Sequence, residues 1–261
     1  MIKEGPSEND SWKNTITDVA KVVYERNKLH EECQKYDTLK NIPKEELYKL
    51  VIDGRAHMYG PYGFENEKGY LAAMFNGLRH TLQHSNDPLS ATHYDGINKI
   101  CLKTVTRDMA EYGFRNKGQP RSYGIDGYTE AGYKELVAEN DISVGRRGEN
   151  LEVWTNDKTK EYLMNTFNEL SNEYSKELEA AKTDEEKITA IVKFCQKIER
   201  RHFCCDGNIR TSVFCVMNME LVKQGLNPTM FNDPNDIDGH SVEEMVVLVK
   251  DGQKVVEGMK G

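Results

Sequence analysis

Apolar side chains recur every three or four residues along most of the chain, which is the spacing of one face of an α-helix. Ile188, Ile191, Cys195 and Ile198 show this spacing, and His202 extends the same face by one turn. The pattern predicts a mainly α fold, a single compact helical domain with long structured loops. The predicted helices span residues 11–35, 67–84, 92–113, 155–181, 183–202 and 208–225, with shorter helical segments over 44–53, 129–140 and 241–252.

Two of these helices carry a clear start signal. Thr183 with Glu186, and Ser241 with Glu244, have the spacing of a capping box, in which the side chains and backbone at a helix start bond each other. The segment that follows the second box also contains the dipeptide Asp251-Gly252, which suits a β-hairpin turn. Helix and hairpin therefore both remain open for the chain beyond Ser241.

Composition and charge narrow the class of protein. The 261 residues are 38% hydrophobic and include no apolar run long enough to cross a bilayer, so we expect no membrane span. The polar N-terminus lacks the apolar region of a Sec-type signal peptide. We expect residues 1–10 to be mobile and residues 11–261 to form one domain. A net charge of −8 disfavours duplex nucleic acid and suits a basic protein partner. The six cysteines include no C-x-x-C pair, which predicts reduced, mostly buried thiols.

A group of chemically active residues lies between two predicted helices. His202 ends one helix, Asp206 and Gly207 form the connection, and Asn208 caps the next helix, which carries Arg210 in its first turn. The N–H groups at a helix start form a natural anion site, and the forked guanidinium of an arginine adds donors to it. The segment therefore suits a phosphate-binding site next to a histidine that acts as an acid, a base or a nucleophile. A capped helix start and a histidine bonded to a carbonyl explain the same residues equally well.

The pattern H-x-x-x-D-G-N-x-R resembles the motif HPFxDGNGR of Fic nucleotidyl transferases. Phe203 replaces the proline of that motif and Ile209 replaces its second glycine, where a side chain hinders the wrap of backbone around a phosphate. The resemblance implies a nucleotidyl (AMP) or phosphocholine transferase that needs ATP or another nucleotide and uses His202 as a base.

A second group of histidines lies near the end of the helix predicted over residues 67–84. His80 and His84 are four residues apart on one helix face, and His93 follows in the next loop. This spacing suits a metal ion, but no third ligand follows at a clear spacing. We therefore expect no metal site here. His80 lies among apolar residues and is expected to be half-buried.

Over about residues 15–255 the chain resembles the phosphodiesterase domain of the SidE family of Legionella effectors, closest in form to the stand-alone Dup-type deubiquitinases. That family uses a His, Glu and His spread along a helical domain. The matching residues here are His80, Glu139 and His202, separated by 59 and 63 residues. Glu135, one turn before Glu139, is an alternative match, and His84 would share the cleft as a substrate contact.

This resemblance implies a metal-free phosphodiesterase without a cofactor, acting on phosphoribosyl-linked serine ubiquitination or on ADP-ribosylated ubiquitin. His80 would form a covalent phosphohistidine, Glu139 would orient it, and His202 would act as acid and base. Arg210 and Asn208 would bind the phosphate oxygens. The implied partners are ubiquitin and ubiquitin-modified host proteins, and the implied protein is a monomeric effector secreted into the host cytoplasm. A Fic-like transferase and a non-catalytic helical binding module are the alternatives.

Overall fold

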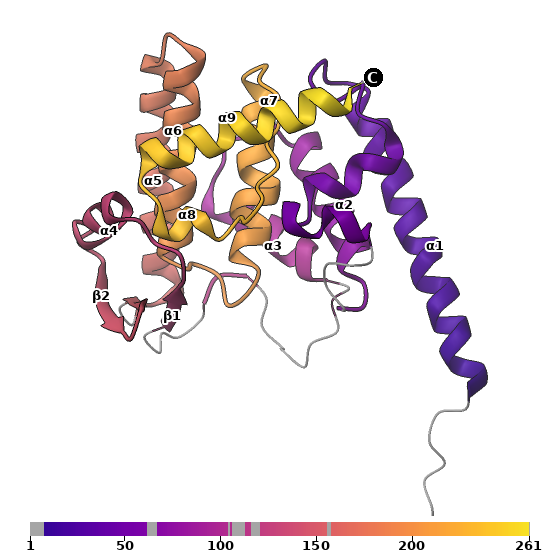
Figure 1. Cartoon of the computed structure of the whole chain (residues 1–261), viewed down its shortest axis with the longest axis horizontal. Helices are drawn as coiled ribbons and strands as arrows, with labels where there is room; N and C mark the ends of the chain where they lie inside the picture. The colour runs from indigo at the N-terminus through magenta and orange to yellow at the C-terminus, as the bar shows by residue number, and fades with distance from the viewer. Residues whose placement is uncertain are drawn as a thin grey trace, which may run out of the picture.

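The computed structural model of the chain describes residues 8–61, 67–103, 105, 113–115, 121–155 and 158–260. Helices dominate these residues, which confirms the predicted mainly α fold (Figure 1). Residues 1–10 were predicted to be mobile. Of these, residues 1–7 lie outside the described residues, and residues 8–10 belong to the first helix. The helices are α1 Glu8–Cys33, η1 Lys44–Leu50, η2 Gly54–Tyr59, α2 Tyr70–Gln83, α3 Ala91–Leu102, α4 Glu130–Val137, α5 Lys160–Ala180, α6 Asp184–Arg200, η3 Arg210–Met217, α7 Asn218–Lys223, α8 Asp236–Gly239 and α9 Val242–Met259.

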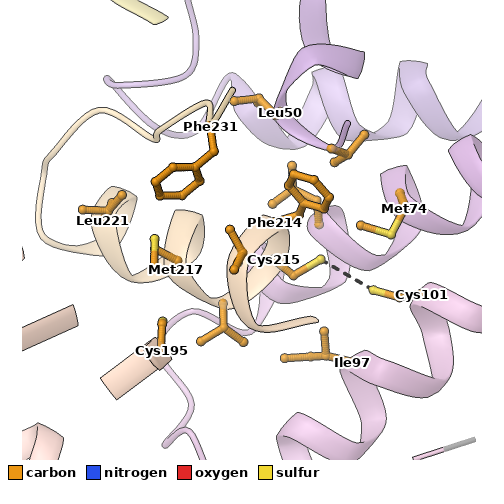
Figure 2. Packing of buried hydrophobic residues seen from close by; sticks show 14 of the residues in the cluster. Leu50, Met74, Ile97, Cys101, Cys195, Phe214, Cys215, Met217, Leu221 and Phe231 are labelled. Atoms are coloured by element: carbon orange, nitrogen blue, oxygen red, sulfur yellow. Dashed lines mark hydrogen bonds between the residues drawn. The ribbon is translucent and has the colours of Figure 1, made fainter. Parts of the chain in front are cut away.

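The main core forms around the buried π-helical segment η3. In Figure 2, Phe214, Cys215 and Met217 of η3 lie among side chains from other helices, including Met74 of α2 and Ile97 of α3. Elements α2, α3, α6 and α7 all pack against η3. The apolar spacing that predicted these helices therefore corresponds to faces that meet in one core, and this core fixes the helix that carries Arg210.

A small sheet, which the helical pattern did not predict, lies beside α4. Its strands are β1 Arg121–Ile125, β2 Ile142–Arg147 and β3 Asn150–Thr155, paired antiparallel in the order β1-β3-β2. Tyr123 is opposite Val153, which in turn is opposite Val144. One face of the sheet packs on Leu136 of α4 and forms a second, smaller core. The sheet brings Tyr123 toward the end of α6.

Some helix ends lie where the sequence predicted them, and others do not. Both predicted capping boxes form, at Thr183 and at Ser241. The hairpin interpretation after Ser241 is wrong, because α9 runs through Gly252 to Met259. Gly252 lies against the backbone of Met230, where a Cβ atom would meet the carbonyl oxygen at 2.5 Å. The helix predicted over residues 92–113 ends at Leu102, and Gly113 instead lies in a bend with a φ of 94°.

The cysteines are free, and all but Cys205 are buried, as the sequence predicted. The Sγ atoms of Cys101 and Cys215 lie 3.6 Å apart in the main core (Figure 2). Burial raises the pKa of Cys195 and Cys204 well above the ordinary value, so these thiols remain protonated and unreactive. Within the described part of the chain, no helix is both long and apolar enough to cross a membrane.

Candidate functional site: the loop between α6 and η3

The loop after α6 is held in place by an extended segment from far earlier in the chain. Phe114 and Cys204 form an antiparallel bridge. On either side of it, the Arg115 N–H donates to the Phe203 carbonyl and the Cys205 N–H donates to the Gly113 carbonyl, both at 3.0 Å. These backbone bonds fix the course of residues 203–205, which join His202 to the rest of the motif.

The second half of the loop closes on itself before the next helix begins. The Asn208 side chain accepts from the Cys204 N–H at 2.9 Å and donates to the Cys204 carbonyl at 3.2 Å. Gly207 adopts a φ of 66°, in the left-handed region that favours glycine, and its N–H donates to the Asp206 carboxylate. The Asn98 side chain donates to the Asp206 carbonyl at 2.9 Å. The predicted substrate contact Asn208 thus has its side chain bonded within the loop, and the Thr211 N–H of η3 donates to the Gly207 carbonyl.

His202 stands at a strained position directly after α6. Its φ of 45° is rare for a residue with a side chain, and such positions are often functional. The ring Nδ1 lies 2.9 Å from the Glu199 carbonyl. Because a carbonyl oxygen only accepts, Nδ1 carries the proton in this contact, and Nε2 of the neutral ring is the acceptor. The Tyr123 ring stacks on the imidazole at 3.8 Å, and the Tyr123 hydroxyl donates to the Arg200 carbonyl at 2.7 Å.

Arg210 lies in the first turn of η3, as predicted, and its guanidinium is engaged within the protein. Nη2 is 2.7 Å from the Glu67 carboxylate, and the guanidinium carbon lies 4.7 Å from the centre of the Tyr70 ring. The side chain is largely buried. A phosphate at the helix start would therefore share Arg210 with Glu67.

The three histidines of the second predicted group form a cluster of their own at the end of α2 and the start of α3. The ring centres of His80 and His84 lie 4.4 Å apart, and those of His93 lie 6.2 Å and 5.9 Å from them. His84 pairs with Asp87 at 2.8 Å. Burial and then the neighbouring histidines lower the pKa of His80 and of His93, so both rings favour the neutral form. Within the described residues, no group of three or more His, Cys, Asp or Glu side chains is arranged to hold a metal ion.

Glu139 lies just beyond α4, where two consecutive arginines bind it. Its carboxylate oxygens are 3.1 Å from Arg200 and 2.6 Å from Arg201. Glu135, the alternative match, accepts from the Val242 N–H at the start of α9. These residues line a cavity of about 460 Å³ between α4, α5 and α6.

The three residues of the predicted trio have different direct contacts, although Tyr123, which stacks on His202, bonds the carbonyl of Arg200, a partner of Glu139. His80 contacts the rings of His84 and His93, Glu139 contacts the two arginines, and His202 contacts Glu199 and Tyr123. Among the described residues, no hydrogen bond, ion pair or ring contact joins His80 to Glu139 or to His202. Convergence of these three side chains in one cleft remains a prediction.

Sequence reasoning missed two residues beside His202. Glu199 is three residues before His202, so the i, i+3 spacing of a helix end is a signal that points to it. Tyr123 belongs to a strand distant in sequence, and no local pattern connects it to the motif. Glu67, the partner of Arg210, was also missed, because it is distant from Arg210 in the sequence.

Comparison with known proteins adds one partial relative. No family model matches the sequence. Over 82 residues, or 31% of this chain, the sequence is 42% identical to phosphocholine transferase AnkX of Legionella pneumophila. The matched part is 9% of the length of that protein, so the chain resembles a small portion of it.

Proposed function

We propose that this chain is a Fic-like transferase, in which His202 acts as a general base and a phosphocholine or nucleotidyl group moves onto a hydroxyl group. The orientation of His202 carries the proposal, because the Glu199 carbonyl fixes the proton on Nδ1 and leaves Nε2 as the acceptor. The motif resemblance and the partial similarity to a phosphocholine transferase both favour this class.

In the proposed reaction, a nucleotide with a phosphoanhydride bond supplies the group that is transferred. Nε2 of His202 takes the proton from the acceptor hydroxyl, and the hydroxyl oxygen forms a bond to phosphorus. The phosphoanhydride P–O bond breaks at the same phosphorus, and the remaining nucleotide phosphate or pyrophosphate leaves with the electron pair. The backbone N–H groups at the start of η3, together with Arg210, would stabilise negative charge on the phosphate oxygens.

The two departures from the Fic motif are compatible with the local structure. Phe203 is fully buried, with its ring 5.6 Å from that of Phe114 and 5.7 Å from that of Phe167, so aromatic packing anchors the loop. Ile209 packs its side chain against the main core and has helical backbone angles, φ −54° and ψ −42°. Its side chain therefore contributes to the core beneath the helix start.

The test is transfer from a defined donor. Wild-type protein is incubated with CDP-choline or with ATP and a host-cell extract, and modified hydroxyl side chains are identified by peptide mass spectrometry. His202→Ala is expected to abolish transfer, and His80→Ala is the matched control, expected to retain it. Loss of transfer in the His80 variant, with full activity in the His202 variant, would contradict the proposed role of His202.

The phosphodiesterase hypothesis remains a prediction and makes the opposite forecast for His80. It requires cleavage of phosphoribosyl-linked ubiquitin or conversion of ADP-ribosylated ubiquitin, with a phosphate adduct on His80. The same variants incubated with these two substrates, followed by intact-mass measurement at neutral pH, decide between the hypotheses. Because the partial relative is a Legionella protein, we also propose that this chain is a bacterial effector that acts in the host cell.

A further inference from the structure

Glu199 presents two groups to the His202 ring from the last turn of α6. Its carbonyl is bonded to Nδ1, and its carboxylate Oε1 lies 3.9 Å from the same nitrogen. We propose that Glu199 is a positioning residue, whose negative charge stabilises the protonated ring that forms when His202 takes a proton. This inference rests on the proposed function. It explains how the His202 ring would hold the proton that it takes from the acceptor hydroxyl during transfer.

The Glu199 carboxylate is buried inside the protein, unlike a carboxylate on the surface. Glu199 has no exposed surface. Burial of a carboxylate is costly unless hydrogen bonds compensate for the lost water. The Ser212 hydroxyl of η3 lies 2.5 Å from Oε2 and 2.8 Å from the Asn208 carbonyl, so the carboxylate shares this donor with a backbone oxygen. Charges in a buried setting are screened less than charges in water, so Glu199 acts on the ring more strongly than an exposed carboxylate at the same distance.

Other groups near the ring are engaged in contacts of their own, and buried Asp238 acts on the stacked Tyr123 as Glu199 does. Tyr123 covers one face of the imidazole, and its hydroxyl is bonded to a backbone carbonyl. The neighbouring guanidiniums of Arg200 and Arg201 are both bonded to Glu139, on the cavity side of α6. A carbonyl alone would fix the tautomer, whereas the carboxylate adds the charge that a protonated imidazole requires.

The chain offers a matched control in Glu220 of α7. Glu220 is also almost fully buried and also accepts a hydrogen bond from a hydroxyl, that of Tyr174 at 2.7 Å. Glu199→Gln and Glu220→Gln therefore make the same substitution at two similarly buried sites, although Glu220 also has Lys223 3.8 Å away. Only the first of these sites adjoins the His202 ring.

The experiment follows the His202 ring by nitrogen-15 NMR in histidine-labelled protein, with His202→Gln used to assign its signals. An opposite charge at this distance changes proton affinity by about tenfold or more. In Glu199→Gln the His202 ring is therefore expected to bind a proton at least tenfold more weakly, whereas in Glu220→Gln it is expected to titrate as in the wild type. An unchanged His202 titration in folded Glu199→Gln protein would overturn the proposal.

The Ser212→Ala variant and the pH profile of kcat/KM give two further tests. Ser212→Ala retains the carboxylate but removes its donor, so it should shift the titration in the same direction by a smaller factor if Glu199→Gln does not fold. An unchanged titration in folded Ser212→Ala protein would then overturn the proposal. In an active preparation, the acidic limb of kcat/KM should move to lower pH in Glu199→Gln, because a less basic ring stays neutral there. The NMR titration needs no activity, so a shifted titration with no transfer under any condition would refute the proposed function and leave the role of Glu199 intact.

Discussion

Replacement of Glu139 by glutamine tests whether this residue is structural or catalytic. Glu139 bonds two arginines, and Arg200 is only 3% exposed. Removal of one partner of a buried ion pair leaves the other charge uncompensated, at a cost of about 3–5 kcal/mol. We expect Glu139→Gln to lower the free energy of unfolding by about 3 kcal/mol, toward the lower end of that range, because Arg200 also donates to the carbonyls of Asp238 and His240.

A second carboxyl group makes this cost depend on pH. The pKa of Asp238 is raised to about 7, because burial and the Glu139 charge raise it more than the Arg200 charge lowers it. Without Glu139 the pKa of Asp238 should fall, so this group would ionise near neutral pH and partly compensate Arg200. The loss of stability should therefore be larger near pH 5 than near pH 8. The double variant Glu139→Gln/Asp238→Asn lacks this compensation and should remain destabilised at both pH values.

Urea unfolding followed by circular dichroism at pH 5 and pH 8 measures these differences. Glu169→Gln is the matched control, because Glu169 lines the same cavity and has no ion pair within the described residues. Its effect should stay within about 0.5 kcal/mol. If Glu139→Gln changed stability as little as the control does while abolishing turnover of a phosphoribosyl-ubiquitin substrate, the structural role would be refuted and Glu139 would be catalytic.

Three further outcomes follow from individual contacts. A Cβ atom at residue 132 would lie 2.0 Å from the Gly239 carbonyl oxygen, so Gly132→Ala should lower the melting temperature, while Gly96→Ala, which meets open space on α3, should leave it unchanged or raise it slightly. Burial and then His84 lower the pKa of His93 from 6.5, so the folded state binds fewer protons than the unfolded state and loses stability as pH falls below about 6.5. His93→Phe should flatten this dependence in urea titrations at pH 5 and 7, and a wild-type slope in the variant would contradict it. Glu67→Gln should lower the KM for a nucleotide donor, and an unchanged KM would show that the carboxylate does not compete for Arg210.

The sequence predicted the helices because their signals are local. The apolar face of α6 and the capping box at Thr183 both lie within a single segment, and both are present in the structure. The sheet was missed for a physical reason. Each strand is five or six residues long and stands in a segment rich in glycine and charge, so alternation is weak. The contact between Tyr123 and His202 exists only after that sheet has formed.

The end of α6 shows why the site was harder to predict than the fold. Four consecutive residues at the end of α6 divide between two sets of contacts, and the left-handed φ of His202 turns the chain out of the helix there. Arg200 and Arg201 bond Glu139 at the cavity, whereas Glu199 and His202 contact each other beside the motif loop. A sequence pattern can propose Glu139 and His202 as partners, but it cannot show that Glu139 also binds two arginines. Substitutions on the cavity side should therefore change stability first, and substitutions at Glu199 should change the proton affinity of His202 first.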